Sequence, residues 1–263
     1  MAAESAPEPT RIVVTGASGR MGEELLAAAG DRVDVQVVAA VSRTPGSVTA
    51  DAAVGTDLDA TLADDHVDVV VDFTAPEATA AYAETAAQYG VAFVTGTTGL
   101  DGHEADPLDS LDAASESVAV LHASNFSRGI AALRGAVRQA AASLPGYDVE
   151  VTETHHNGKR DAPSGTALTL VEDIEAERPD LTERQHGRDG EQPRDADEIG
   201  VHARRAGDVT GAHEVLFAGT RETLSLSHRA GDRGVFAVGA LDAAVAVADR
   251  EPGRYAFADL LQD

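Results

Sequence analysis

The stretch Arg11–Gly22, RIVVTGASGRMG, decides the fold of this chain. Arg11–Thr15 is short and rich in β-branched residues, which predicts a buried strand, and a helical pattern follows from Gly19 to about Gly30. Between this strand and this helix the chain must turn tightly, and a tight turn lets a pyrophosphate approach the helix N-terminus, whose N–H groups and dipole favour anions. The stretch therefore predicts a dinucleotide-binding unit, and the alternative is a tight turn with a structural role only. Three glycines spaced G-x-x-G-x-x-G form the turn: Gly16, Gly19 and Gly22.

Further apolar runs alternate with helical segments through the first half of the chain. Pro76–Tyr89 is rich in alanine with helical spacing, and four runs predict strands: Val33–Val41, Val67–Phe73, Val91–Thr95 and Val118–Ala123. Strands that alternate with helices at this spacing predict parallel βαβ units. The runs are continuously apolar, as strands covered on both faces require. The expected fold class is α/β, a Rossmann-like doubly wound parallel sheet.

The pattern changes after Ser124. Alternating apolar and polar residues predict half-exposed strands at Asp148–Thr154, Ile199–Arg205, His213–Phe217 and Thr223–His228. Helices are predicted at Phe126–Ser143, Ser164–Glu177 and Gly234–Ala248, and the charged, aperiodic Arg178–Asp197 is expected to be a mobile loop. We therefore expect a second α+β domain on an open mixed or antiparallel sheet. The expected division is a disordered leader over 1–10, a dinucleotide-binding domain over 11–126 plus 234–263, and a substrate-binding and oligomerisation domain over 127–233.

Composition limits the classes of function. The 263 residues are 43% hydrophobic, enough for real cores, but no apolar run suits a membrane span and the N-terminus has no secretion signal. The chain has no cysteine, which excludes disulfides and thiolate chemistry and makes a cytoplasmic location the expectation. A net charge of −25 opposes binding to nucleic acid or anionic membranes. Because acidic residues occur in every segment, we expect a halophilic protein; the alternative is an ordinary acidic one.

The residues after the predicted strands indicate which cofactor binds. About twenty positions after the last glycine, where an acidic residue would bind the ribose of NAD, this chain has Ser42 and Arg43. The missing carboxylate and the arginine predict that NADPH is accepted; the alternative is that Arg43 is a solvated arginine at a strand end. Gly96–Gly99 (GTTG) and Ala123–Phe126 (ASNF) follow two more predicted strands, where doubly wound folds bind ligands.

The most informative stretch for chemistry is Glu153–Thr166, ETHHNGKRDAPSGT. Ser164 is a good N-cap, which leaves the N–H groups of Gly165 and Thr166 pointing outward, where a carboxylate can bind. A local cationic group in an acidic chain predicts an anionic ligand rather than a loop of solvated charges. The positive charge is concentrated in four neighbouring residues: His155, His156, Lys159 and Arg160.

Two features of this stretch suggest proton transfer. Lys159 is the only lysine of the chain, and lysine can release a proton near neutral pH whereas arginine cannot; chance survival of this lysine is the alternative. Adjacent histidines on an extended segment point to opposite sides, so they are poor ligands for one metal, and no metal site is expected. One histidine acting as a general acid and the other binding substrate fits better.

The chain resembles the dihydrodipicolinate reductase family, whose run HHxxKxDAPSGTAL stands here from His155 to Leu168. This run is highly specific, and shorter matches support it in the family's order from about residue 11 to 250. These are GxxGRMG, DFT at Asp72–Thr74, GTTG, NFS at Asn125–Ser127, RAGDxxGxH at Arg205–His213 and FAxGA at Phe236–Ala240.

The resemblance implies a reductase of the diaminopimelate route to lysine, which reduces the small dicarboxylate 4-hydroxy-tetrahydrodipicolinate with loss of water. It implies His155 and Lys159 as proton donors, and His156 with the Gly165 and Thr166 amides as ligands of the substrate carboxylates. It also suggests a homotetramer joined through the open sheets. NADPH, NADH or both would be held by Gly16, Ala17, Ser18, Gly19, Arg20, Met21, Arg43, Gly96, Thr97, Thr98, Ala123, Ser124, Asn125 and Phe126.

Two positions depart from the family pattern. Ser42 replaces a frequent acidic residue, which leaves the cofactor preference open, and Arg160 adds charge where an apolar residue is common. Another nicotinamide dehydrogenase is an alternative, but a thiol mechanism needs cysteine, and a Tyr-x-x-x-Lys mechanism would need tyrosine where His155 stands. A non-catalytic nucleotide-sensing module is a second alternative, and it would need the glycine turn without the histidine–lysine run.

Overall fold

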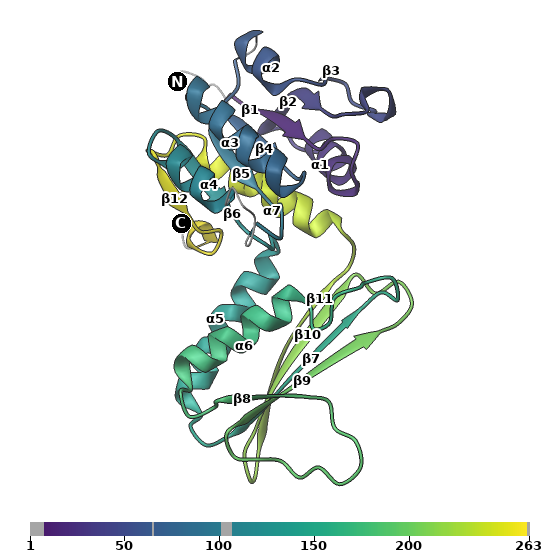
Figure 1. Ribbon diagram of the computed structural model, residues 1–263, viewed down its shortest axis with the longest axis vertical. Helices are drawn as coiled ribbons and strands as arrows, with labels where there is room; N and C mark the ends of the chain where they lie inside the picture. The colour runs from purple at the N-terminus through teal and green to yellow at the C-terminus, as the bar shows by residue number, and fades with distance from the viewer. Residues whose placement is uncertain (1–7, 65, 101–106, 262–263) are drawn as a thin grey trace, which may run out of the picture. The chain divides into compact units, whose positions relative to one another are not determined.

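The computed structural model describes residues 8–64, 66–100 and 107–261, and the chain divides into two compact units (Figure 1). The first unit comprises Met1–Phe126 with Arg233–Asp263, and the second comprises Ser127–Asp232. Residues 1–7 of the expected leader lie outside the described residues, and Thr10 already begins the first strand. Helices long and apolar enough to cross a lipid bilayer are absent from the described ranges.

The described part of the first unit contains a seven-stranded sheet with the order β12-β6-β5-β4-β1-β2-β3, and its pairings are all parallel. The inner strands β4 and β5 are buried along their whole length, as parallel strands between two layers of helices must be. The prediction of a Rossmann-like parallel sheet is confirmed. The strands are β1 (Thr10–Thr15), β2 (Val35–Val41), β3 (Ala53–Gly55), β4 (Val69–Asp72), β5 (Ala92–Thr95), β6 (Ala119–His122) and β12 (Gly253–Tyr255).

Helices cover both faces of this sheet. α1 (Arg20–Gly30) packs against α7 (Gly234–Val247) on one face, whereas α2 (Leu58–Asp64), α3 (Pro76–Tyr89) and α4 (Pro107–Ser115) lie on the other (Figure 1). α3 begins with proline, whose fixed φ suits a first turn, and it ends before Gly90, which has a left-handed φ of 69°. Short 3-10 turns, Pro45–Ser47 and Asp259–Leu261, complete the unit.

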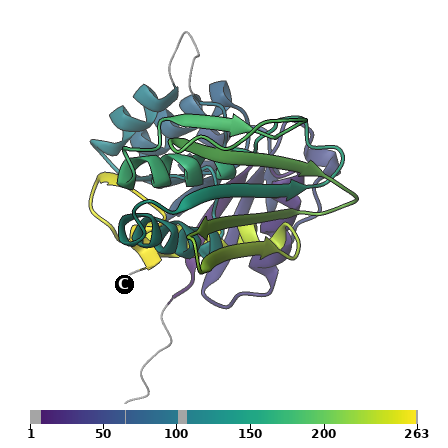
Figure 2. The same ribbon diagram turned by 90° about the horizontal axis from the view of Figure 1, so that it is seen from below.

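Residues 127–232 are described throughout and form a five-stranded sheet with the order β11-β10-β7-β9-β8 (Figure 2). β10 pairs antiparallel with β7 and β11, whereas β9 is parallel to β7 and β8. The sheet is therefore mixed, as predicted for the second domain. The strands are β7 (Asp148–His155), β8 (Glu183–His186), β9 (Glu198–Arg205), β10 (Gly211–Ala218) and β11 (Thr223–Ala230).

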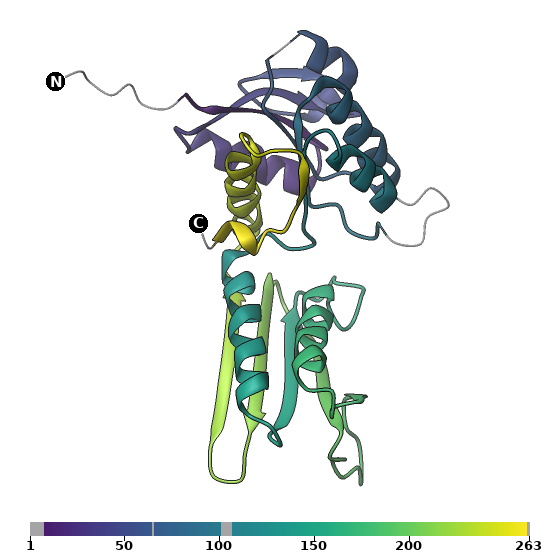
Figure 3. The ribbon, with the colours of Figure 1, turned by 90° about the vertical axis from the view of Figure 1, so that its left-hand side faces the viewer.

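Two helices, α5 (Arg128–Ser143) and α6 (Gly165–Glu177), lie along the same face of this second sheet (Figure 3). Each begins with a serine N-cap: Ser127 accepts a hydrogen bond from Ile130 N–H, and Ser164 accepts one from Ala167 N–H. Burial alternates along β10, so every second side chain enters the core beneath the helices. Within residues 127–232, no helix covers the opposite face.

The prediction that Arg178–Asp197 is a mobile loop was wrong for part of the segment. Glu183–His186 forms β8, which pairs in parallel with β9 at the edge of the sheet. Its side chains are mostly exposed, so the strand has no apolar alternation by which the sequence could show it. Arginines fix the segment instead: Arg178 donates to Asp180 and to the Leu144 carbonyl, and Arg184 pairs with Glu175.

Candidate active site

The turn between β1 and α1 has the geometry that a phosphate group requires. Gly16 has a φ of +73°, and a Cβ there would lie 2.4 Å from the Phe73 carbonyl oxygen. A Cβ on Gly22 would lie 2.4 Å from the Gly16 carbonyl oxygen, so the helix packs directly on the turn. Gly19 is the N-cap of α1, and no side chain of the described residues caps this helix. The first-turn N–H groups can therefore bind an anion, and the turn fits a dinucleotide.

A cavity of about 550 Å³ opens beside this turn. Ser42 is buried at its wall, where its hydroxyl lies 2.6 Å from the Ser18 hydroxyl and accepts a hydrogen bond from Thr44 N–H. Arg43 is exposed at the same cavity, so its guanidinium can reach a ligand held there. The cavity thus unites part of the predicted cofactor set with residues that were not predicted. Its lining includes Gly16, Ser18, Gly19, Ser42, Arg43, Phe73, Thr74 and Tyr82.

The other predicted cofactor residues lie in the same turn or after neighbouring strands. Ala17 stands in the turn and Arg20 and Met21 begin α1, while Gly96–Thr98 follow β5 and Ala123–Phe126 follow β6. The side chains of Ala17, Thr97 and Phe126 are buried and do not lie open to solvent at these strand ends. The ring of Phe126 packs instead against Phe73 and Phe257, with centroids 5.8 and 5.2 Å away.

Asp72, the last residue of β4, ties together the strand ends around the cavity. Its carboxylate is fully buried, and hydroxyl groups from neighbouring strands, a helix and two loops donate to it. Thr97 also accepts a hydrogen bond from Thr74 N–H at 3.1 Å, which joins the loop after β4 to the loop after β5. The network therefore holds the cavity wall in place. The donors are Thr15 (2.7 Å), Thr74 (2.7 Å), Thr79 (2.6 Å), Thr95 (2.8 Å) and Thr97 (3.0 Å).

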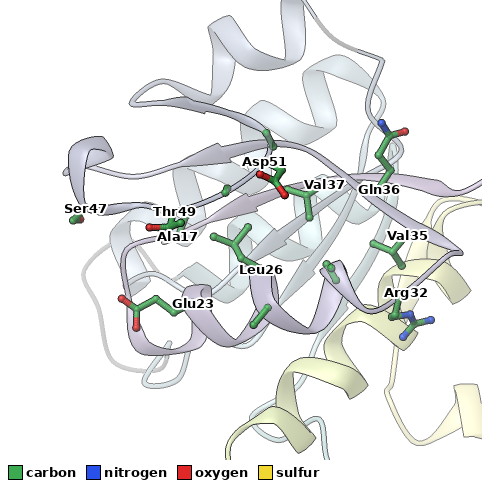
Figure 4. Close-up of a pocket in the computed structure, with 15 residues that line it drawn as sticks. Ala17, Glu23, Leu26, Arg32, Val35, Gln36, Val37, Ser47, Thr49 and Asp51 are labelled. Carbon is green, nitrogen blue, oxygen red and sulfur yellow. The ribbon is translucent and has the colours of Figure 1, made fainter.

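A second hollow of about 690 Å³ lies between α1, β2 and residues 47–52 (Figure 4). Glu23 and Asp51 contribute carboxylates to its lining beside the aliphatic side chain of Leu26. Its arginine, Arg32, is already paired with Asp34 and Asp242, each at 2.6 Å. Carboxylates repel a pyrophosphate, so this hollow does not suit the phosphates of a dinucleotide.

The second unit gathers the predicted catalytic residues around the end of β7. Glu153 is completely buried, and its carboxylate accepts hydrogen bonds from the Arg205 guanidinium (2.8 Å to each oxygen), Ser164 N–H (3.0 Å) and His155 Nδ1 (2.6 Å). Burial raises the pKa of Glu153, but the hydrogen bonds from Arg205 and His155 outweigh burial and hold that pKa below its ordinary value. An ionised carboxylate only accepts hydrogen bonds, so His155 Nδ1 is the donor.

The other ring nitrogen of His155, Nε2, faces Gly211 of β10, where a Cβ would lie only 3.1 Å from it. The ring of His213 packs edge-on against His155 with centroids 5.2 Å apart. Burial, reinforced by the neighbouring His155, lowers the pKa of His213 to about 4, so His213 is neutral at physiological pH. Its Nε2 lies 3.1 Å from the Ser164 hydroxyl.

The N-terminus of α6 adjoins this group. Ser164 satisfies Ala167 N–H with its hydroxyl at 3.2 Å. Gly165, which is exposed, and Thr166, which is half-buried, form the first turn. First-turn N–H groups point out of a helix, and the dipole favours negative charge there. This end of α6 can therefore receive a carboxylate, and the binding of one by Gly165 and Thr166 stays a prediction.

Lys159 lies in the loop between β7 and α6. Its Nζ lies 2.8 Å from Asp161 Oδ2, and this contact lowers the pKa of Asp161. Two backbone hydrogen bonds shape the loop, from Lys159 N–H to the His156 carbonyl (3.1 Å) and from Asn157 N–H to the Gly207 carbonyl (3.0 Å). The residues predicted to bind and protonate the substrate thus all stand in one unit, and those predicted to bind the cofactor stand in the other.

Sequence reasoning assigned no role to Glu153, Arg205, His213 or Asp72. All four occur in stretches that resembled the family: Glu153 opens the central stretch, Arg205 and His213 begin and end RAGDxxGxH, and Asp72 begins DFT. Their position within these family-like stretches was the only sign in the sequence that they could belong to the site. The pairing of Glu153 with Arg205 depends on β7 and β9 lying side by side, which the sequence does not state.

Comparison with protein families accounts for almost the whole chain. Residues 10–126 match the family model described as dihydrodipicolinate reductase, N-terminus. Residues 129–261 match the model described as dihydrodipicolinate reductase, C-terminus.

Individual proteins show the same similarity. The chain is 50% identical over 248 residues to the 4-hydroxy-tetrahydrodipicolinate reductase of Natronomonas pharaonis, covering 94% of this chain and 98% of that protein. It is 47% identical over 252 residues to the same-named enzyme of Haloarcula marismortui, covering 96% and 99%. Among solved structures, dipicolinate-bound dihydrodipicolinate reductase from Paenisporosarcina sp. TG-14 aligns with a TM-score of 0.76 at 23% identity, covering 94% and 97%, and this likeness concerns the fold.

Proposed function

This chain belongs to the dihydrodipicolinate reductase family, and on that premise we propose that it reduces 4-hydroxy-tetrahydrodipicolinate to tetrahydrodipicolinate with NADPH or NADH and loss of water, in the diaminopimelate route to lysine. One observation carries the proposal for the site. A buried, ionised Glu153 holds His155 beside the N-terminus of α6, and the lone lysine Lys159 lies in the adjoining loop. This arrangement combines proton donors with a carboxylate-binding helix end.

The protein's own groups supply protons and charge. When bound, the nicotinamide supplies the hydride that the reduction needs. Reduction of a ring double bond adds a proton as well, and we assign the donors as His155 and Lys159. The substrate carries two carboxylates, which we assign to His156 and to the first-turn N–H groups of Gly165 and Thr166.

The cofactor would lie on the turn Gly16–Met21 and on the loops after β2, β5 and β6. The glycine contacts described above support this, because side chains at Gly16 and Gly22 would collide with backbone atoms that shape the turn. Arg43 would pair with the 2′-phosphate of NADPH. Ser42 places a neutral hydroxyl beside Arg43 at the cavity wall, where a carboxylate would repel that phosphate, and Glu77 lines the same cavity.

The activity is tested by steady-state reduction of freshly generated 4-hydroxy-tetrahydrodipicolinate with each cofactor. We expect turnover with the wild-type protein and loss of turnover in His155→Gln. Arg11→Gln is a matched control, because Arg11 binds Gln36 and the His66 carbonyl in the first unit, away from the turn. Absence of turnover with both cofactors over a range of salt concentrations would contradict the proposed function.

We also propose that the protein is a homotetramer whose subunits meet through the open face of the second sheet. Leu216 of β10 points to this face, between buried neighbours that point to the core, and so do Glu150 and His202 of β7 and β9. Light scattering should give a tetramer for the wild type and smaller species for Leu216→Arg. A monomeric wild type would contradict the proposal.

Finally, we propose that the enzyme works in a salt-rich cytoplasm, where cells keep their nicotinamide cofactors. The chain has 45 acidic and 20 basic residues, and in the described ranges the buried carboxylates are limited to Asp72, Glu153, Asp173 and Glu198. Surface carboxylates at this density repel one another in dilute buffer, and salt screens them. The free energy of unfolding should therefore rise with KCl concentration, and a fall would favour an ordinary acidic protein.

A further inference from the structure

A buried ion pair stands behind the proposed proton donor. Glu153 and His155 lie on the same strand with one residue between them, so both side chains project from the same face of β7. Arg205 reaches Glu153 from β9 with two hydrogen bonds of 2.8 Å, and Ser164 N–H adds a third from the start of α6. None of the three partners is a substrate or cofactor group, so the arrangement exists before anything binds.

We propose that Glu153, held ionised by Arg205, is a positioning residue that keeps Nδ1–H of His155 bound to its carboxylate, so that the His155 imidazolium donates its Nε2 proton to the substrate and returns to the neutral tautomer with the proton on Nδ1. The proposal rests on the proposed function, in which His155 is a proton donor. Glu153 does not touch the substrate itself, because its carboxylate is completely buried.

The hydrogen bonds leave the carboxylate no other arrangement. Its Oε1 accepts from Arg205 and Ser164 N–H, and its Oε2 accepts from Arg205 and His155 Nδ1. The Arg205 guanidinium cannot lose its proton, so it favours the ionised carboxylate at all working pH values. Glu153 therefore stays an acceptor, and the neutral His155 ring must carry its proton on Nδ1.

The surroundings of Nε2 agree with this assignment. Gly211 of β10 is the neighbour on that side, and its missing side chain leaves the ring edge uncrowded. His213, the titratable side chain packed edge-on against the ring, is neutral and bonded to Ser164, so it does not compete for Nε2. The charged groups beyond it are Lys159 and Asp161, which pair with each other.

The variant Glu153→Gln gives a sharp prediction. Oε1 accepts from two groups that can only donate, Arg205 and Ser164 N–H, whereas Oε2 accepts from Arg205 and from His155 Nδ1, which can become an acceptor. The amide oxygen of the introduced glutamine should therefore settle at the Oε1 position. The amide nitrogen then faces His155, and because it is a donor, Nδ1 must become an acceptor. The neutral ring then carries its proton on Nε2, and the imidazolium that donates a proton is disfavoured, because its Nδ1–H would face the amide N–H.

Nitrogen-15 NMR of the imidazoles reads the tautomer directly, with His155 assigned from its loss in His155→Gln. We expect Nδ1 to be protonated in the neutral ring of the wild-type protein, and Nε2 to be protonated in that of Glu153→Gln. In the same variant kcat should fall by about 10²–10⁴ with KM little changed, the pattern of a tautomer inversion in a carboxylate–histidine pair. Glu175→Gln is the matched control, because Glu175 of α6 pairs with Arg184 at 2.6 Å in the same unit and does not contact His155.

The results separate this inference from the function itself. Wild-type His155 with its proton on Nε2 would overturn the inference even if Glu153→Gln failed to fold. An unchanged tautomer or an unchanged kcat in a folded Glu153→Gln would also overturn it. If instead His155→Gln kept full activity, the proton-donor role in the proposed function would fail while the tautomer measurement remained valid.

Discussion

Replacement of Lys159 separates proton donation from charge. Its Nζ lies 2.8 Å from Asp161, but the Lys159 side chain is 22% exposed and that of Asp161 is 59% exposed. A pair this open to solvent contributes at most about 1 kcal/mol to folding. A positioned proton donor contributes about 10²–10⁴ in rate, which is about 3–5 kcal/mol of transition-state stabilisation. The two effects differ enough to be measured separately.

We therefore expect Lys159→Arg to fold like the wild type, with a similar KM, because guanidinium keeps the positive charge and can pair with Asp161. Its kcat should fall by about 10²–10⁴, because guanidinium does not release its proton. Lys159→Ala should lose kcat to the same extent and also raise KM. The assay is oxidation of NADPH with freshly generated substrate, with chemical unfolding measured in parallel.

Arg160 provides the control, since it is the exposed cation next in sequence. Arg160→Ala should leave kcat nearly unchanged. If Lys159→Arg turned over at close to the wild-type rate, Lys159 would hold an anion only, and its being the lone lysine would say nothing about proton transfer.

Three further results are expected from the site. His155→Gln should lower kcat chiefly, whereas His156→Gln should raise KM chiefly; changes in KM alone for both would remove His155 as proton donor. Arg43→Ala should raise the KM for NADPH about tenfold or more and barely affect the KM for NADH, and Ser42→Glu should favour NADH. Both effects should be smaller near ~1 M salt. If Arg43→Ala weakened the binding of both cofactors equally at two ionic strengths, Arg43 would not bind the 2′-phosphate. The pKa of an unfolded histidine is near 6.5, whereas burial lowers that of folded His213 to about 4. The unfolded state therefore binds more protons between these values, and the free energy of unfolding should fall as pH falls from 6.5 to 4. In His213→Asn the free energy of unfolding should depend less on pH over this range.

The sequence predicted the long elements of the fold because each carries a strong pattern. α3 has helical spacing between a proline and a glycine, and the inner strands are continuous apolar runs. The elements that it did not predict are short or exposed. β3 and β12 have three residues each and complete the sheet edges, and β8 is held by pairing with β9 rather than by burial.

The residues of the site likewise differ in whether the sequence could predict them. His155, Lys159 and the cap Ser164 could be predicted because they lie within one short stretch, where local spacing carries chemical meaning. Arg205 could not, because it stands fifty-two positions after Glu153 and meets it only when β9 pairs with β7. Buried partners that join strands distant in sequence are visible in the fold and not in the pattern.

The buried carboxylates that the structure describes in this acidic chain are all paired with hydrogen-bond donors. In the described ranges each one is matched by donors: Asp72 by threonine hydroxyls, Glu153 by Arg205, Asp173 by Arg134 and Arg138, and Glu198 by Arg188 and Arg194. Salt screens exposed charges within a few ångströms at about 1 M but reaches buried pairs much less. Salt can therefore relieve repulsion at the surface without loosening the bonds that orient His155 and the cavity wall. The contact that salt should weaken is the exposed one that we propose between Arg43 and the 2′-phosphate of NADPH, so changes in salt should alter cofactor choice more than proton transfer.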